Sequence, residues 1–261
     1  MNNKKFMSVL TLTILGSTLL APSVLAAEQD ENGGVYSSNG MVKFVPDLDP
    51  TEPVDPTKPD TPVDPIDPTN PENPNPQPGT PGPLSIDFAS SFDFGENKIT
   101  NKDEIYYARA QRFGSYDNRP NYVQVSDKRG TNAGWTLKVK QEQQFEAKNT
   151  LNNILTGAAI SFADSKANSI TDVDKPDVFD IENLVPGEER VIMAAKKDTG
   201  AGTWLDYWGE VSQVIEKDKD NNNIEVDITK SVTLSVPGST PKDAAAYRTT
   251  LTWTLSDIPG V

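Results

Sequence analysis

The chain has 261 residues and a formal charge of −14, and it contains neither cysteine nor histidine. Without cysteine there are no disulfides, no lipoprotein thioether anchor and no thiol nucleophile. Without histidine, Ser-His-Asp and Cys-His catalysis are excluded and zinc lacks its commonest ligand, so we expect no cofactor and no metal. Such an acidic surface repels phosphate backbones and anionic lipids, which argues against nucleic acid and leaves carbohydrate or another protein as partner.

The first 26 residues are typical of a secretory signal peptide. Lys4 and Lys5 precede an apolar run at 6–20, and cleavage after Ala26 or Ala27 fits the small residues there. A transmembrane anchor is the weaker interpretation, because the apolar run is short and is interrupted by Thr and Ser. No later segment is long enough to span a bilayer. We therefore expect a soluble, secreted mature chain, more acidic by the two lost lysines, with no membrane insertion.

Residues 27–45 form a short N-terminal segment. Ser-Ser-Asn-Gly at 37–40 predicts a turn, and Met-Val-Lys-Phe-Val at 41–45 fits a single strand. The sequence leaves open whether this strand docks on the C-terminal domain.

A Pro/Asp-rich stretch follows at 46–83. Proline recurs at every third position from Pro50 to Pro74, which matches the three residues per turn of polyproline II. At about 3.1 Å per residue such a helix spans on the order of 120 Å. Acidic residues that precede several prolines repel each other along a second edge. The stretch therefore predicts an extended polyproline II arm that acts as a spacer, with disorder as the alternative.

Residues 84–261 are long enough for one domain with its own core. Segments of period two recur, separated by turn residues such as Pro-Gly at 186–187 and 237–238. Residues 145–155 are the one stretch compatible with a short helix. We predict a mainly β domain, an antiparallel β-sandwich or a partly open barrel. The expected strands lie at 84–88, 122–127, 135–140, 160–164, 189–194, 223–228, 231–236 and 251–255.

Two of these segments share a Trp-x-Leu element. Residues two apart in a strand point to the same face, so Trp135 and Leu137 share one face and Trp253 and Leu255 share another. The intervening threonines and lysines point the other way. These tryptophans are interpreted either as core anchors or as an exposed surface on which sugar rings stack.

A second aromatic cluster, Gly-Ala-Gly-Thr-Trp-Leu-Asp-Tyr-Trp-Gly-Glu, spans 200–210. Its flanking glycines suggest a loop in which Trp204, Tyr207 and Trp208 contact a glycan or a protein partner. The alternative is a loop that folds its aromatic rings back over the end of the sandwich.

The polar stretch Lys-Asp-Lys-Asp-Asn-Asn-Asn-Ile-Glu at 217–225 has the spacing of a calcium loop at Asp218, Asp220 and Asn222. It lacks a glutamate at the twelfth-ligand position. Asn221 and Asn223 tolerate a left-handed backbone, so a hairpin loop is the preferred interpretation over a metal site.

The end of the chain resembles the distal motif of WxL-domain proteins of Gram-positive bacteria. It runs Tyr-Arg-Thr-Thr-Leu-Thr-Trp-Thr-Leu-Ser-Asp-Ile-Pro from Tyr247 to Pro259. Gly-Trp-Thr-Leu-Lys-Val at 134–139 is similar to the proximal motif, and Val-Ser-Asp-Lys-Arg-Gly at 125–130 to the family's pattern before it. The resemblance covers 84–261, and the signal and Pro-rich stretch match the usual layout.

This resemblance implies an extracellular protein whose C-terminal domain attaches non-covalently to peptidoglycan and which assembles with other surface proteins. Nothing apolar and basic follows Gly260 and Val261, so we expect retention by the folded domain rather than by a sortase tail. We expect no catalytic residue. The alternatives are a two-carboxylate glycosidase acting on wall glycan, and a protein-binding scaffold without direct glycan contact.

Overall fold

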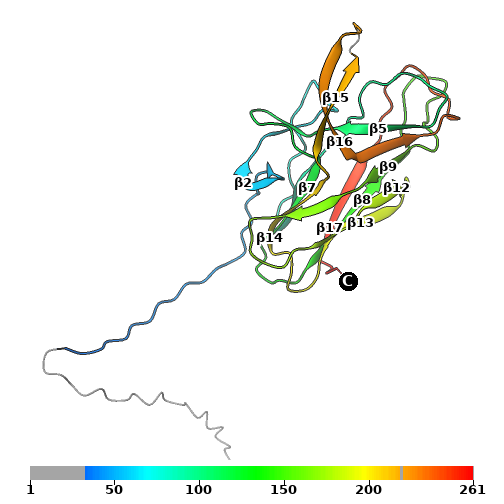
Figure 1. Ribbon diagram of the computed structural model, residues 1–261. Coiled ribbons are helices and arrows are strands. Elements are labelled where there is room, and N and C mark those ends of the chain that lie inside the picture. The colour runs from blue at the N-terminus through cyan, green and yellow to red at the C-terminus, as the bar shows by residue number, and fades with distance from the viewer. Residues whose placement is uncertain (1–32, 218–219, 261) are drawn as a thin grey trace, which may run out of the picture. The chain divides into compact units, whose positions relative to one another are not determined.

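The computed structural model describes residues 33–217 and 220–260, and the signal peptide lies outside them. The chain divides into two units, Met1–Lys43 and Phe44–Val261. In the first unit, described residues 33–43 are exposed and form no strand. The second unit is all-β within the described ranges (Figure 1). Among the described residues there is no helical segment with the length and hydrophobicity of a membrane span.

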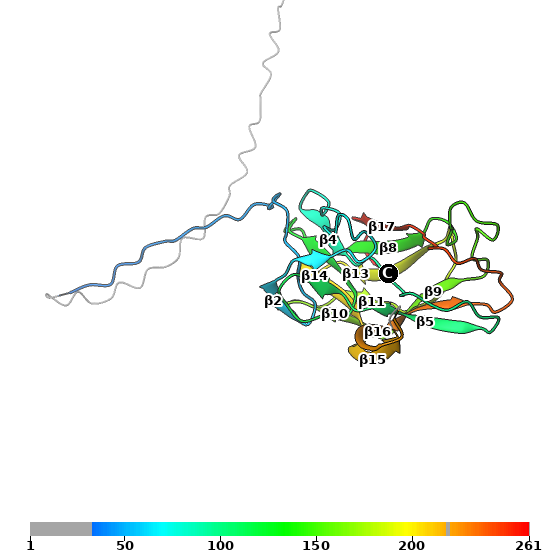
Figure 2. The same cartoon turned by 90° about the horizontal axis from the view of Figure 1, so that it is seen from above.

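Three larger antiparallel sheets form the body of the second unit, and two two-stranded sheets accompany them (Figure 1 and Figure 2). The motif sheet has the order β11 (Asp177–Val178), β13 (Glu189–Ala195), β8 (Trp135–Gln141), β17 (Leu251–Ser256). The tryptophan sheet has the order β10 (Ser165–Asn168), β14 (Gly202–Trp208), β7 (Tyr122–Asp127), β4 (Leu84–Ala89). The hairpin sheet has the order β12 (Ile181–Leu184), β9 (Ala159–Phe162), β16 (Asn223–Val236), β15 (Val211–Lys217), and β5 (Glu104–Arg109) also pairs with β16.

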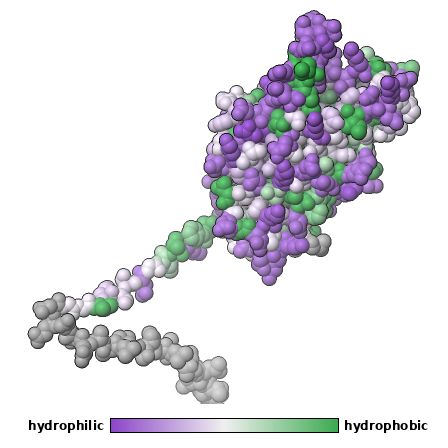
Figure 3. Space-filling view, viewed as in Figure 1, coloured by the Kyte–Doolittle hydropathy of each residue, from purple (hydrophilic) through white to green (hydrophobic). Residues whose placement is uncertain are grey.

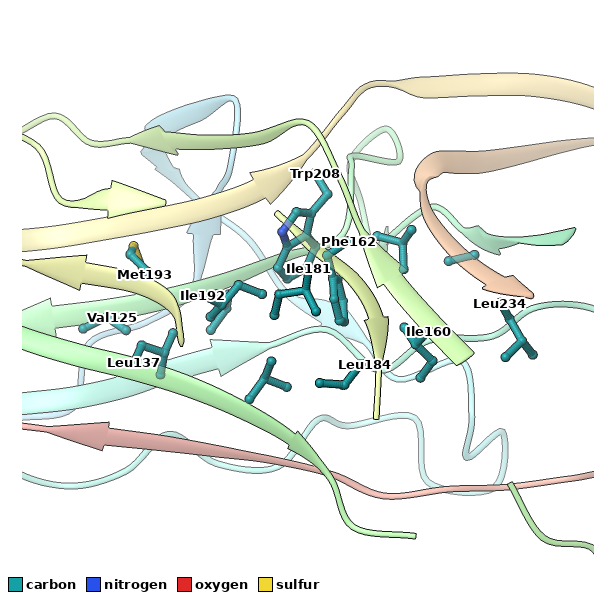
Figure 4. Packing of buried hydrophobic residues seen from close by; sticks show 14 of the residues in the cluster. Val125, Leu137, Ile160, Phe162, Ile181, Leu184, Ile192, Met193, Trp208 and Leu234 are labelled. Carbon is teal, nitrogen blue, oxygen red and sulfur yellow. The ribbon is translucent and has the colours of Figure 1, made fainter. Parts of the chain in front are cut away.

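One main core joins the three sheets. Leu137 of the motif sheet, Val125 of the tryptophan sheet and Ile160 of the hairpin sheet are buried in the same cluster (Figure 4). Burying such side chains contributes roughly 1.5–3 kcal/mol each, which is the main force that holds the sheets together. The arrangement confirms the predicted antiparallel sandwich, and in the described ranges no sheet closes into a barrel.

The predicted strands are present, with one difference. The segments at 223–228 and 231–236 are a single long strand, β16, because no turn separates them. The helix considered for 145–155 is wrong: these residues form an irregular hairpin in which Glu146 pairs with both Ile154 and Arg248.

The Pro-rich stretch is a third layer on the sandwich. It contains β1 (Val54–Asp55) paired with β2 (Lys58–Pro62), and β3 (Pro65–Ile66) paired with β6 (Arg112–Phe113). Val63 and Phe113 are buried in a second core against Phe88, Tyr122 and Leu205. This layer covers the outer face of the tryptophan sheet.

Specific polar contacts fix this layer to the domain. Asp55 is buried and accepts a 2.7 Å hydrogen bond from Nε of Arg119. Burial disfavours the ionised carboxylate, but bonds from Thr57 and Arg119 outweigh it and hold the pKa of Asp55 below its usual value. The Gln124 side chain accepts from Val54 N at 2.8 Å.

The prediction of a polyproline II spacer is therefore wrong for the stretch from Val54 to Ile66. Proline period and charge favoured an extended solvated chain, but Val54 and Val63 are apolar, and Asp55 has a cationic partner on the domain. Proline tolerates an edge position where its missing N–H faces away from a partner strand. The compact unit accordingly begins at Phe44 rather than at Leu84.

The strand predicted at 41–45 and the hairpin predicted around Asn221 had different outcomes. Residues 41–45 form no strand in the structure, and the side chains of Met41 and Phe44 are 96% and 88% exposed. The hairpin predicted around Asn221 is confirmed: Lys217 pairs with Asn223, and Asn221 has a left-handed φ of 65°. Asp218 lies outside the described residues. No group of three or more potential metal-ligating side chains occurs in the described part of the chain.

Candidate functional site

The two Trp-x-Leu elements lie side by side, although more than a hundred residues separate them. β17 pairs antiparallel with β8, with Trp253 opposite Val139 and Leu255 opposite Leu137. Cross-strand partners share a face, so the apolar faces of both elements point into the same core. The chain thus brings its two similar segments together as neighbouring strands of one sheet.

Trp135 is fully buried. Its Nε1 donates a 2.9 Å hydrogen bond to the carbonyl oxygen of Gly200. Gly200 has φ of 70°, and a Cβ there would lie 2.4 Å from Cβ of Ala195 and 3.1 Å from Nε1 of Trp135. Only glycine accommodates both the backbone conformation and the close approach of the indole.

Trp253 differs from the other three tryptophans because it is only half-buried. Its ring stacks on that of Trp208, with centroids 6.3 Å apart and an interplanar angle of 25°. Trp208 comes from β14 of the tryptophan sheet, so this stack joins two sheets. Trp253 also lines a cleft.

Residues 202–208 form strand β14, so the prediction of a loop for the aromatic cluster at 200–210 is wrong. Trp204 and Trp208 point into the main core and are 4% and 0% exposed. Leu205 and Tyr207 point to the opposite face, beneath the Pro-rich layer. Because both faces of this strand are covered, it lacks the alternation of apolar and polar residues that marks a half-exposed strand. Neither Trp204 nor Trp208 presents a free ring to a glycan.

Tyr207 is half-buried, and Nζ of Lys166 lies 5.7 Å from its ring centroid, a cation–π distance. Of the three aromatic residues in the second cluster, it alone retains a partly accessible side chain. It lies on the face away from Trp253, so the structure does not bring the two together.

The cleft has a volume of about 750 Å³. It opens along the seam between β4 and β17, which are the edge strands of the tryptophan and motif sheets. One wall consists of residues 86–95, the other of residues 242–251 with Trp253, and residues 67–80 of the Pro-rich stretch form the rim.

Aromatic side chains make up much of the cleft floor. Phe92 packs edge-on against Phe162 at 5.4 Å, and Phe94 packs edge-on against Phe145 at 6.3 Å. Phe92, Phe94 and Phe145 line the cleft together with Trp253 and Tyr247. The sequence interpretation missed the three phenylalanines. For Phe92 and Phe94 the signal was the Phe-Asp-Phe alternation, which follows the predicted strand at 84–88 after three residues.

Tyr247 orders the wall before β17. Its hydroxyl donates a 2.6 Å hydrogen bond to the carbonyl of Asn152 and accepts one from the backbone N of Asp243. The Asp243 carboxylate in turn accepts hydrogen bonds from both N and Nδ2 of Asn152 at 2.8 Å. These bonds from Asn152 hold the pKa of Asp243 below its usual value. The wall is therefore tied to the hairpin at 145–155.

Each acidic side chain along the cleft is hydrogen-bonded within the domain. Asp87 is buried and accepts from Ser85 and Ser126 at 2.6 Å and from Gln124 at 3.0 Å. Burial nevertheless raises the pKa of Asp87. The other acidic residues with such bonds are Asp67, Asp93 and Asp243.

Three cations line the cleft. Lys242 is half-buried and donates hydrogen bonds to the carbonyls of Thr100, Pro237 and Thr240, whereas the other two are exposed and lack an acidic partner. Within the described residues, neither Lys98 nor Arg248 forms an ion pair, and both are exposed. Arg248 donates one hydrogen bond, from Nη1 to the carbonyl of Thr69. The cleft thus combines an aromatic floor with unpaired positive charge, in a protein whose net charge is −14.

This geometry defines an all-β domain in which two Trp-x-Leu strands pair and one tryptophan lines an open cleft. The chain belongs to the WxL-domain family, since the family model described as "WxL domain surface cell wall-binding" matches residues 31–259. The match includes the Pro-rich stretch, consistent with its packing on the domain. No curated protein and no solved structure matches the chain. The protein is thus extracellular and attached to the cell wall.

Proposed function

We propose that this protein is a non-catalytic surface protein that attaches non-covalently to peptidoglycan through the cleft beside β17. One observation carries the proposal: of the four tryptophans, Trp253 alone is half-buried rather than buried, and it lines the cleft. A wall-binding domain needs an accessible contact surface, and concave sites with apolar walls and a few polar groups are where ligands usually bind.

A glycosidase is less well supported than a binding site. General acid catalysis needs a protonated carboxyl within reach of the glycosidic oxygen. Asp87 has a raised pKa and lines the cleft, but its oxygens accept bonds from Ser85, Gln124 and Ser126. A carboxyl group used in this way is a structural acceptor rather than a proton donor.

Assembly with other surface proteins is also part of the proposal. The side chains of Tyr36, Met41 and Phe44 are each at least 88% exposed, and the structure gives the segment 33–45 no strand partner. Contiguous exposed apolar side chains of this kind mark protein interaction sites more often than free surface.

Binding to purified peptidoglycan sacculi tests the attachment. We expect the full chain to co-sediment with sacculi and Trp253→Ala to reduce binding at least tenfold. The matched control is Thr254→Ala, one position along the same strand, because Thr254 is exposed and does not line the cleft. Thermal unfolding of each variant separates lost contact from lost fold.

A second measurement does not depend on a variant. Bound sacculus fragments should protect tryptophan fluorescence from acrylamide, because only Trp253 is accessible to the quencher. Binding without protection, together with wild-type binding by folded Trp253→Ala, would place the wall contact outside the cleft.

A further inference from the structure

We infer that the cleft recognises the peptide part of the wall, in an extended conformation, by adding it as a strand to the open edge of β17. This inference rests on the proposed function, because it assumes that the cleft is the wall contact. It goes further by naming the class of ligand: a short extended peptide with small apolar side chains and a carboxylate, rather than the sugar chain.

The backbone of β17 has an unpaired side. The backbone N–H of Glu142 donates a 2.9 Å hydrogen bond to the carbonyl of Thr250. The backbone polar groups of Thr250 therefore point toward the segment that continues β8. Hydrogen-bonding directions alternate along an antiparallel ladder, and β17 pairs with β8 without a bulge. The N–H and C=O groups of Leu251, Trp253 and Leu255 therefore point away from β8.

No described residue takes up these outward groups, since β17 pairs only with β8. The strand also carries none of the features that normally protect an edge. Its sequence, Leu-Thr-Trp-Thr-Leu-Ser, has no charge and no proline. The facing edge strand β4 is different, because Thr80 already exchanges hydrogen bonds with Ile86 there. An unprotected edge beside a cleft is the arrangement used for strand addition.

The side chains and charges of the cleft fit a peptide. Phe92, Phe94 and Trp253 provide apolar contact for small side chains of an added strand. Lys98 and Arg248 have no acidic partner in the described part of the chain, and a peptide of the wall brings carboxylates. The positive charge at the cleft is therefore complementary to the negative charge of the peptide.

The aromatic rings are less well placed for sugar stacking. Trp253 already stacks on Trp208, and Phe92 and Phe94 pack edge-on against neighbouring rings. A glycan chain is bound by free flat ring faces, whereas an extended peptide needs backbone partners and apolar space. The cleft supplies backbone partners and apolar space.

The first experiment compares three probes against the full chain: intact sacculi, sacculi from which an amidase has removed the peptides, and the free peptides so released. We expect binding to intact sacculi, at least tenfold weaker binding to the stripped glycan, and competition by the released peptides. Equal binding to intact and stripped sacculi would overturn the inference and leave the attachment standing. Failure to bind intact sacculi would overturn both.

A matched pair of variants tests the strand edge itself. Leu251→Ala shortens the side chain but keeps the outward N–H, whereas Leu251→Pro also removes that N–H without touching a bond to β8. We expect Leu251→Pro to bind intact sacculi at least fivefold more weakly than Leu251→Ala when both remain folded by circular dichroism. Equal affinities of the two variants would overturn strand addition. If Leu251→Pro does not fold, the comparison of the three probes alone tests the inference.

The other occupant to consider is residues 41–45 of a second copy. Sedimentation of the full chain reports it directly: a monomer at micromolar concentration supports the wall peptide as occupant. A dimer that the released peptides do not dissociate would overturn the inference in favour of self-association.

Discussion

The rings of Trp208 and Trp253 stack at 6.3 Å with an angle of 25° between their planes. One comes from β14 of the tryptophan sheet and the other from the last strand of the described chain, so the stack fastens the motif sheet to its neighbour. The same ring of Trp253 lines the cleft. Trp253 therefore both joins the two sheets and lines the cleft proposed to contact the wall.

Truncation of the two motif tryptophans should have unequal effects. Trp135 is fully buried, so Trp135→Ala should cost about 3–5 kcal/mol of unfolding free energy as a full core truncation. Trp253→Ala should cost less, roughly 2–3 kcal/mol, because the ring is half-buried. Urea denaturation followed by circular dichroism measures both. A larger loss for Trp253→Ala would mean that the Trp208 stack matters more than burial.

The second prediction concerns Asp206, which is completely buried on β14. Neither of its carboxylate oxygens has a side-chain or backbone bond of normal geometry among the described residues. Burial raises the pKa of Asp206 well above its ordinary value, and the nearby charge of Asp180 adds to this. Asp206→Asn should therefore stabilise the protein at neutral pH, by on the order of 1–3 kcal/mol.

The sign of its pH dependence follows from the raised pKa. A carboxyl whose pKa is higher in the folded state makes the protein more stable as the pH falls from that pKa toward 3.8, the ordinary value. The advantage of Asp206→Asn should accordingly shrink as the pH is lowered. Melting temperatures of both proteins between pH 8 and pH 4 measure this. A constant difference would show that Asp206 is not the titrating group.

The third prediction concerns the docking of the Pro-rich layer. Asp55→Ala removes the buried partner of Arg119, and breaking such a pair costs up to about 3–5 kcal/mol when both groups are buried. The loss should be smaller here because the Arg119 side chain is 18% exposed. We expect residues 51–66 to become sensitive to protease while the sandwich stays folded.

Asp60→Ala is the matched control for this layer, because Asp60 is exposed and bonds only to its neighbour Thr61. Its cleavage pattern should be that of the unmodified protein. Equal protection of the stretch in Asp55→Ala would mean that the second core, rather than the ion pair, holds the layer in place. Docking through Asp55 should persist in mild acid, since a lowered pKa keeps its contribution until the pH falls through that pKa.

The fourth prediction concerns attachment to cells. The net charge of −14 argues against ionic adsorption to an acidic wall, so moderate salt should leave the protein on washed cells or strengthen its retention by screening repulsion. Denaturant should release it intact, without wall-digesting enzymes. Release by 0.5 M salt alone would show that ionic contacts dominate.

The β class, the two Trp-x-Leu strands and the family were predictable without the structure, because these depend on local features. Alternation along 135–140 and 251–255 is a period-two pattern that specifies which face is buried. The order of the two Trp-x-Leu motifs along the chain can be read directly from the sequence. The hairpin around Asn221 was predictable for the same reason, since its left-handed backbone is a local preference.

Which of these segments become neighbours was not predictable from local patterns. The pairing of β8 with β17 and the cleft between β4 and β17 depend on contacts between distant residues, which no local pattern encodes. Strand β14 was hidden because the Pro-rich layer covers its second face and removes the expected alternation. That layer itself was misjudged because proline spacing describes an isolated chain, whereas docking depends on Arg119 and Gln124 of a distant surface.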